Sequence, residues 1–251
     1  MTLKEFFEAN PETAVAFSGG VDSVYLLAMA MRYGKRVMAY YVKTVFQPEF
    51  EWRDARKAAE LLGAGLCRID CRILDRPKVA ENPADRCYHC KQAIFSEICR
   101  AAKEDGYPVV LDGTNASDEA GDRPGMRALE EMGIRSPLRE CGLTKARIRE
   151  ESKKYGLFTW DKPAYACLAT RVPTGMRITH SLLSRVEASE EKLFEKGFTD
   201  FRVRILDGAL KLQFTEAFLP KAFERREELL ECLRGDGIEV LLDLTPRKGG
   251  D

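Results

Sequence analysis

The sequence predicts an α/β fold, with a parallel sheet that helices cover on both faces, followed by a smaller α+β lobe. Short β-branched apolar runs alternate with segments of helical periodicity before Thr179. A turn containing two glycines joins the first of these runs to the helix that follows it. After Thr179 the order becomes helix, two strands, helix and strand, which is typical of an α+β lobe.

The elements before Thr179 are expected in a regular order. Thr2 and Glu5 have the spacing of a capping box, which opens a first helix. Strands are expected at Thr13–Phe17, Arg36–Val42, Gly65–Asp70 and Pro108–Asp112. Between them we expect helices that begin near Val21 and that cover Glu49–Gly63 and Gln92–Lys103. Because strands alternate with helices, the sheet should be parallel and should bind ligands outside the carboxyl ends of its strands.

A second set of elements follows the linker Trp160–Arg177, which is rich in proline, glycine and arginine. We expect helices at Ser181–Lys196 and Glu216–Leu233, and strands at Phe201–Leu206, Ala209–Phe214 and Ile238–Leu242. The first two strands form a hairpin around Asp207-Gly208, and the lobe has a ferredoxin-like character. The predicted domains are therefore residues 1–178 and residues 179–251.

Composition argues against two classes of partner. The 251 residues carry 40 basic and 40 acidic side chains, so no whole-chain field favours nucleic acid or a membrane surface. No apolar run approaches the length of a membrane span, and the first residues do not resemble a signal peptide. We therefore expect a cytoplasmic protein that binds neither nucleic acid nor a membrane.

The turn S-G-G-V-D-S after the first strand has the composition of a phosphate-binding loop. Gly19 and Gly20 allow the backbone to approach a ligand closely, and the free N–H groups at the start of the helix favour a phosphate. Ser18 and Ser23 add hydroxyl donors, and Asp22 can hold a Mg²⁺ ion. The chain lacks the Walker pattern G-x-x-x-x-G-K-[ST], so this loop is of another kind. An ordinary glycine-rich turn is the alternative interpretation.

A second polar loop follows the fourth expected strand. Gly113, Thr114 and Asn115 should lie at the same sheet edge as the first loop, because the carboxyl ends of parallel strands meet there. We expect Asp118 to join them around a nucleotide. Capping of the next helix is the alternative for Asn115 and Asp118.

Eight cysteines indicate metal or redox chemistry in a chain too long to be a disulfide scaffold. Cys87 and Cys90 form a C-x-x-C pair, which places two thiolates within reach of one metal or cluster, or forms a redox pair. With Cys167 as a third ligand, the chain could hold a 4Fe–4S cluster with one iron left open. The remaining cysteines are interpreted as small buried hydrophobic residues: Cys67, Cys71, Cys99, Cys141 and Cys232.

Motifs along nearly the whole chain resemble one enzyme family. S-G-G-V-D-S resembles the PP-loop of the ATP pyrophosphatases, which cleave ATP between its α- and β-phosphates to adenylate a carbonyl or carboxylate. Together with N-P-A-D-R-C-Y-H-C-K, D-G-T-N-A-S-D, K-P-A-Y-A-C-L-A-T-R and F-R-V-R, it resembles the LarE family of ATP-dependent sulfur transferases. The resemblance implies a PP-loop fold, ATP, Mg²⁺ and a homo-oligomer. It also implies a small anionic substrate, pyridinium-3,5-biscarboxylic acid mononucleotide, whose carboxylates become thiocarboxylates of the nickel-pincer nucleotide cofactor.

The resemblance also implies roles for particular residues. Asp22 and Cys167 are the expected catalytic residues. Family members with three matching cysteines resemble cluster-dependent enzymes, which implies a 4Fe–4S cluster on Cys87, Cys90 and Cys167. Members with only the cysteine that matches Cys167 sacrifice its sulfur and keep dehydroalanine, and this is the alternative for the present chain. The chain departs from the family at Gln213, where an acidic residue is expected.

Basic residues are expected to bind the anions. Arg171, Arg202 and Arg204 are expected to bind the anionic substrate, since arginine forks match carboxylates and phosphates. The resemblance implies that Arg202 and Arg204 contact the phosphate, and a pair of solvated surface arginines is the alternative for these two. Arg171 would also bias the neighbouring catalytic cysteine toward its reactive thiolate. Lys145 and Arg149 are candidates for contacts with pyrophosphate, or else belong to a solvated helix face.

Three other functions remain open. A tRNA-thiolating PP-loop enzyme also uses three cysteines and a cluster, but the balanced charge and the lack of paired zinc knuckles favour a small-molecule substrate. An ammonia-using ligase would leave the C-x-x-C pair without a role. A nucleotide-sensing module would need the phosphate loop but no thiols.

Overall fold

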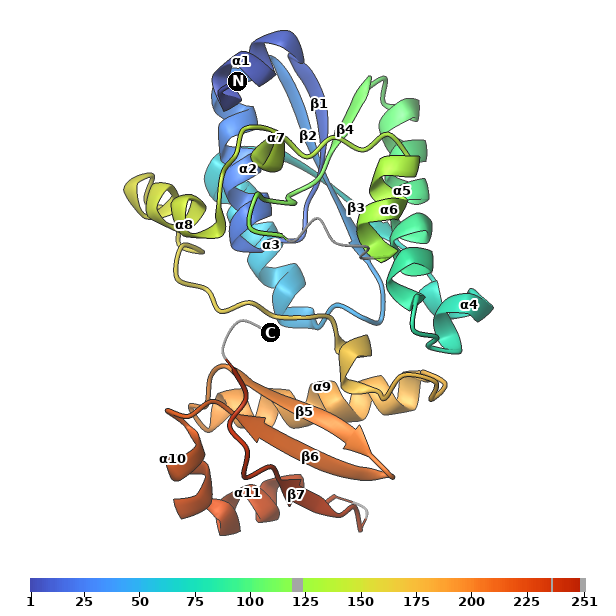
Figure 1. The fold of residues 1–251 in the computed structure, drawn as a ribbon, viewed down its shortest axis with the longest axis vertical. Coiled ribbons are helices and arrows are strands. Elements are labelled where there is room, and N and C mark those ends of the chain that lie inside the picture. The colour runs from blue at the N-terminus through green and yellow to red at the C-terminus, as the bar shows by residue number, and fades with distance from the viewer. Residues whose placement is uncertain (119–123, 236, 249–251) are drawn as a thin grey trace. The chain divides into compact units, whose positions relative to one another are not determined.

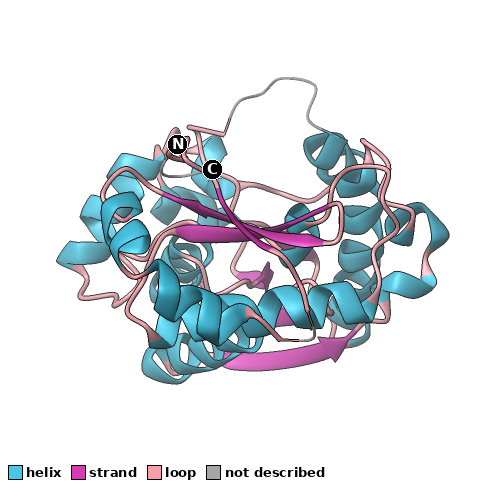
Figure 2. Cartoon of the chain, turned by 90° about the horizontal axis from the view of Figure 1, so that it is seen from below, coloured by secondary structure: helices cyan, strands magenta, loops and turns pink. Residues whose placement is uncertain are grey.

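The structure, a computed structural model, describes residues 1–118, 124–235 and 237–248 (Figure 1). The chain divides into an α/β unit and a small unit. Met1–Ile73 and Asp85–Lys162 form the α/β unit, whereas Leu74–Ala84 and Pro163–Asp251 form the small unit. The change of unit at Pro163 falls inside the linker expected from the sequence, and the predicted domain boundary after residue 178 stays a prediction. Both units combine helices with strands (Figure 2).

The α/β unit contains a parallel sheet, as the sequence predicts. Its strands are β1 (Glu12–Ala16), β2 (Arg36–Lys43), β3 (Gly65–Asp70) and β4 (Val109–Leu111). Their order in the sheet is β3-β2-β1-β4, and each neighbouring pair is parallel. In this register Thr13 lies between Val37 and Val109.

Helices cover both faces of this sheet (Figure 1). They are α1 (Leu3–Ala9), α2 (Val21–Tyr33), α3 (Glu49–Leu62), α5 (Arg86–Glu104), α6 (Pro124–Glu131), α7 (Pro137–Glu140) and α8 (Lys145–Lys154). Val15 and Tyr41 pack into the core that α1, α2 and α3 share. Ala14 and Tyr40, whose side chains point the opposite way, pack into the core formed with α5 and α6. The capping box at Thr2 is present at the start of α1.

The small unit is built on a three-stranded sheet. Its elements are α4 (Pro77–Ala80), α9 (His180–Glu195), β5 (Phe201–Leu206), β6 (Ala209–Phe214), α10 (Leu219–Glu224), α11 (Arg226–Leu233) and β7 (Val240–Leu242). β5 and β6 form the expected hairpin, in which Asp207 and Gly208 both adopt positive φ angles. Phe201 stacks on Phe194 of α9 at a ring distance of 4.8 Å, so one face of the sheet packs on that helix.

Two expectations for the small unit are wrong. The single helix expected at Glu216–Leu233 begins only at Leu219, because Pro220 is compatible with the first turn of a helix and not with its interior. It is also interrupted at Arg225, which ends α10 and precedes α11. The topology is not ferredoxin-like, since β6 pairs directly with β7 in parallel, whereas a split βαβ arrangement places another strand between such a pair.

Candidate functional site

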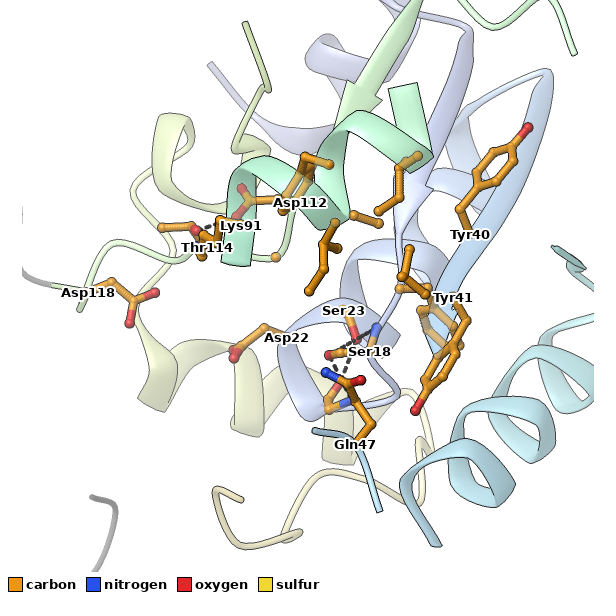
Figure 3. Close-up of a pocket in the computed structure, with 18 residues that line it drawn as sticks. Ser18, Asp22, Ser23, Tyr40, Tyr41, Gln47, Lys91, Asp112, Thr114 and Asp118 are labelled. Atoms are coloured by element: carbon orange, nitrogen blue, oxygen red, sulfur yellow. Dashed lines mark hydrogen bonds between the residues drawn. The ribbon is translucent and has the colours of Figure 1, made fainter. Parts of the chain in front are cut away.

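A cavity of about 350 Å³ lies at the carboxyl ends of β1 and β4 in the α/β unit (Figure 3). In the sheet, β2 lies on one side of β1 and β4 lies on the other, so the strand order reverses at β1. Parallel sheets bind ligands at such a topological switch point. Its polar wall consists of Ser18, Gly20, Asp22, Ser23, Gln47, Lys91, Asp112, Gly113, Thr114 and Asp118. The two polar loops expected at one sheet edge therefore line one cavity.

Hydrogen bonds within the first loop hold it in a tight turn. The Oγ atoms of Ser18 and Ser23 lie 3.1 Å apart, and Ser23 Oγ also accepts from Ser18 N at 3.3 Å. Ser23 Oγ donates to Gly20 O at 3.1 Å. Gly20 is the N-cap of α2, and no side chain caps this end of the helix. The first N–H groups of α2 therefore remain available to an anion in the cavity.

Two glycines of the loops lie where an added Cβ atom would be crowded. Gly19 has a φ angle of +75°, and a Cβ atom there would lie 2.8 Å from the backbone of Ala55 on α3. A Cβ atom on Gly113 would lie 3.2 Å from Ser23 N at the start of α2. Gly113 therefore lets the second loop pack closely on the backbone at the start of α2, and Gly19 lets the first loop pack on α3.

Asp22 is the carboxylate in the first turn of α2. Its Oδ2 atom accepts from Lys145 Nζ of α8 at 2.5 Å, whereas its buried Oδ1 atom has no hydrogen-bond partner in the described part of the chain. Burial raises the pKa of Asp22, the Lys145 ammonium lowers it, and the Asp118 carboxylate adds to the increase. The cavity therefore presents one carboxylate oxygen that lacks a cation or donor.

The second loop has an internal framework of its own. Asp112 accepts hydrogen bonds from Thr114 Oγ1 and from Ser136 Oγ, the latter at 2.5 Å. Asn115 N donates to Asp118 Oδ2 at 2.9 Å, and Asn115 Oδ1 accepts from Ser117 N at 2.8 Å. Asn115 is buried and is not part of the cavity wall, unlike Thr114 and Asp118. Its contacts are those of a capped turn, and its predicted nucleotide contact stays a prediction.

Several wall residues were not anticipated from the sequence. Lys91, Ile94, Phe95 and Ile98 share one face of α5 and line the cavity. The helical spacing of these four residues indicates that they share one face of a helix, and this pattern in the sequence could have identified them as a group. The cavity is also lined by Tyr40, Tyr41 and Gln47. These residues lie near or after the carboxyl end of β2, where parallel sheets bind ligands, so their position in the sequence could have indicated the cavity.

Cys87 and Cys90 lie near the start of α5, three residues apart and so on one side of the helix. Cys87 is exposed and Cys90 is half-buried, and Arg86 Nη2 donates to Cys87 Sγ at 3.6 Å. The next residue, Lys91, lines the cavity, so the C-x-x-C pair is close in sequence to the cavity wall.

None of the eight cysteines forms a disulfide. No cluster of three or more His, Cys, Asp or Glu side chains suited to a metal occurs within the described residues. The five cysteines expected to be buried are half-buried: Cys67, Cys71, Cys99, Cys141 and Cys232. Burial raises the pKa of four of these thiols, in Cys67, Cys99, Cys141 and Cys232.

Cys167 belongs to the small unit and precedes a short 3₁₀ helix, Leu168–Arg171. The fork of Arg171 is fully buried and paired with Glu190 of α9, at 2.8 Å between Nε and Oε1. Its Nη1 atom donates to Ala166 O at 3.1 Å and to Thr170 Oγ1 at 2.8 Å. The donors of Arg171 are therefore engaged within the small unit, and its predicted substrate contact stays a prediction.

Arg202 and Arg204 lie two residues apart on β5, and both donate to the segment that carries the cysteine. Arg202 Nη2 donates to Ala164 O at 2.9 Å, and Arg204 Nη1 donates to Thr170 O at 3.0 Å. Burial, together with neighbouring arginines, lowers the pKa of Arg202 to about 10. Arg204 Nε donates to Gln213 Oε1 at 2.6 Å, so the residue that departs from the family pattern contacts an expected substrate ligand.

The other two basic candidates have different environments. Lys145 contacts Asp22 beside the cavity, as described above. Arg149 instead donates to Trp160 O at 2.6 Å and to Lys162 O at 2.8 Å, which fixes the segment after α8. Its predicted contact with pyrophosphate stays a prediction.

Comparison with known proteins identifies the family. No family model matches the chain. The chain is 33% identical to the pyridinium-3,5-bisthiocarboxylic acid mononucleotide synthase of Lactiplantibacillus plantarum, over 99% of this chain and 91% of that protein. The chain belongs to the LarE family of ATP-dependent sulfur transferases.

Two further relatives extend the comparison. An uncharacterized protein of Synechocystis is 36% identical to this LarE-family chain, over 99% of the chain and 94% of that protein. The tRNA-specific 2-thiouridylase of Frankia alni is 28% identical over 185 residues, which cover 59% of this chain and 52% of that protein. The likeness to this PP-loop enzyme supports the PP-loop fold of the α/β unit. The described helices include none that is long and apolar enough to span a membrane.

Proposed function

We propose that the chain transfers sulfur to pyridinium-3,5-biscarboxylic acid mononucleotide after activating a carboxylate of this substrate with ATP. The observation that carries the proposal is the identity to the synthase over nearly the full length of both chains. The cavity of about 350 Å³ at the end of β1, bordered by a helix N-terminus without a side-chain cap, supports the use of ATP.

Adenylation would take place in the cavity of the α/β unit. The N–H groups of α2 and the hydroxyls of Ser18 and Ser23 would bind the phosphates. The buried, unpartnered Oδ1 atom of Asp22 fits a Mg²⁺ ion, which would neutralise the phosphates. The substrate carboxylate attacks the α-phosphorus, the bond to the β-phosphate oxygen breaks, and pyrophosphate leaves with Lys145 and Lys91 nearby to balance its charge.

A sulfur nucleophile then displaces AMP from the acyl-adenylate. We propose that Cys87, Cys90 and Cys167 hold a 4Fe–4S cluster, because the first two lie three residues apart on one side of α5 and none of the three forms a disulfide. When bound, such a cluster offers an open iron site for a sulfide. In the alternative, the Cys167 thiolate attacks the acyl carbon. Removal of the Cys167 α-proton then breaks its Cβ–S bond, which leaves dehydroalanine in the protein and a thiocarboxylate on the substrate.

Iron content and protein mass separate the two sulfur sources. Anaerobically purified protein that contains iron and sulfide, and whose mass is unchanged after turnover, supports the cluster. A loss of the elements of H₂S at Cys167 supports the sacrificial route. The Cys87→Ser variant should lose iron and retain ATP binding, and unaltered sulfur transfer by this variant would contradict the cluster.

A substrate test separates the proposal from thiolation of tRNA. Pyrophosphate release in the presence of MgATP should require the biscarboxylate mononucleotide and should not respond to tRNA. The equal numbers of acidic and basic residues favour this outcome. Release that requires tRNA, with no response to the mononucleotide, would contradict the proposal.

A further inference from the structure

One buried carboxylate contacts the segment that carries Cys167 on both sides of the cysteine. Glu190 of α9 is 2% exposed and accepts four hydrogen bonds. Tyr165 OH donates at 2.5 Å, Arg171 Nε at 2.8 Å, Arg171 Nη2 at 3.3 Å and the backbone N–H of Val203 at 3.0 Å. Tyr165 precedes the cysteine by two residues and Arg171 follows it by four, so the same carboxylate binds both sides of the cysteine.

Arginine side chains fix the backbone of the same segment. Ala164 O accepts from Arg202, Ala166 O from Arg171, and Thr170 O from Arg204. The carbonyl of Cys167 itself accepts from Thr170 N at 3.0 Å and from Thr170 Oγ1 at 2.8 Å. The Arg171 guanidinium also lies 4.7 Å from the Tyr165 ring centre. Backbone and side chains on both sides of Cys167 are thus held before any substrate binds.

We propose that Glu190 is a positioning residue for sulfur transfer: it locks the segment 163–171 onto β5 so that Cys167 is presented in one fixed conformation. This inference rests on the proposed role of Cys167. It changes the role of Arg171 from a substrate ligand to the link between Glu190 and the cysteine segment. A buried carboxylate that accepts four hydrogen bonds is suited to hold the segment in place, because removal of Glu190 or Arg171 leaves the other buried charge unpaired.

The proposal predicts that substitution of Glu190 affects the two half-reactions, adenylation and sulfur transfer, differently. Every wall residue of the adenylation cavity belongs to the α/β unit, whereas Glu190 and its donors belong to the small unit. Glu190→Gln should therefore leave exchange of pyrophosphate into ATP unchanged and slow single-turnover formation of the thiocarboxylate by about a hundredfold, the cost of a misplaced reacting group. Tyr165→Phe removes one hydrogen bond and keeps the ring, so a smaller loss of about tenfold is expected.

Glu228→Gln is the matched control. It makes the same chemical change in the small unit and breaks the ion pairs of Glu228 with Lys196, which caps the end of α9, and with Arg225, which caps the start of α11. Both half-reactions should be unchanged in this variant. Tyr165→Phe keeps the proposal testable if Glu190→Gln fails to fold. An equal loss of both half-reactions in Tyr165→Phe, or no loss of sulfur transfer, would overturn the proposal.

Hydrogen exchange gives a readout that does not depend on activity. Glu190→Gln and Tyr165→Phe should both increase the exchange of amides in residues 164–171, and Glu190→Gln should also increase that of Val203 N–H, relative to α2 and to the control. If wild-type protein forms no thiocarboxylate, the proposed function fails, and the positioning role is then judged on this exchange alone. Unchanged exchange in the segment would overturn the positioning role whatever the activity.

Discussion

At the scale of single residues, Gly19 shows how the loop 18–23, the proposed phosphate loop, depends on backbone freedom. Its positive φ angle and the 2.8 Å approach of a built Cβ atom to Ala55 leave no room for a side chain. Gly19→Ala should therefore destabilise the fold by about 1–3 kcal/mol, measured by urea unfolding. Gly235→Ala is the control, because its Cβ atom would meet open space. Equal stability of the Gly19 and Gly235 variants would contradict this account of the loop.

Asp22 carries the second prediction at this scale. Asp22→Asn removes the charge proposed to hold Mg²⁺, so the exchange of pyrophosphate into ATP should fall by at least about a hundredfold. The raised pKa of Asp22 means that folding disfavours the ionised form, so the variant should lose no stability in a thermal melt. Asp70→Asn, at the exposed end of β3, is the matched control and should retain the exchange activity. Full exchange activity in Asp22→Asn would exclude the proposed role of this carboxylate.

At the scale of elements, the N-terminus of α8 carries both a helix cap and a lysine that contacts Asp22 of the cavity wall. Thr144 is the N-cap of α8, where its side chain accepts from Arg147 N at 3.3 Å, and the adjacent Lys145 binds Asp22. Thr144→Ala should lower the free energy of unfolding by about 1 kcal/mol, because it leaves an N–H of the first helical turn without its cap. Thr144→Ser keeps the acceptor and should remain close to the wild type in the same chemical denaturation. Equal losses in the two variants would contradict the cap assignment.

Helix α5 shows why the sequence predicted part of the site and missed the rest. The expected helix began at Gln92, whereas α5 begins at Arg86 and so includes the C-x-x-C pair. The cavity-facing Lys91 was missed because the motif was interpreted for its chemistry and not for its place on a helix. The phosphate loop, in contrast, is a local motif between a strand and a helix, and the spacing of its residues predicts it directly.

Partners distant in sequence explain the other differences. The sequence predicts that Arg171 binds the anionic substrate, but its guanidinium pairs with Glu190, nineteen positions away in the chain. Arg149 has the spacing of a solvated helix face, yet it binds two backbone carbonyls after α8. Only tertiary structure brings such donors and acceptors together, so local pattern alone could not have predicted these contacts.

At the scale of the whole molecule, the proposed mechanism assigns activation to the α/β unit and sulfur delivery to the segment of Cys167 in the small unit. The phosphate loop and its cavity belong to the α/β unit, and the Cys167 segment with its arginines belongs to the small unit. The C-x-x-C pair lies in the α/β unit, so the proposed set of three thiols draws on both. The proposed function thus requires the complete chain, whose identity to the synthase likewise spans both units.

The central claim is best tested by the mass of the nucleotide product. Purified protein would be incubated anaerobically with MgATP and pyridinium-3,5-biscarboxylic acid mononucleotide, and the nucleotides would then be separated and weighed. The account predicts a mononucleotide in which sulfur replaces a carboxylate oxygen, formed together with AMP and pyrophosphate. An unchanged mononucleotide recovered from folded, ATP-binding protein would contradict the account.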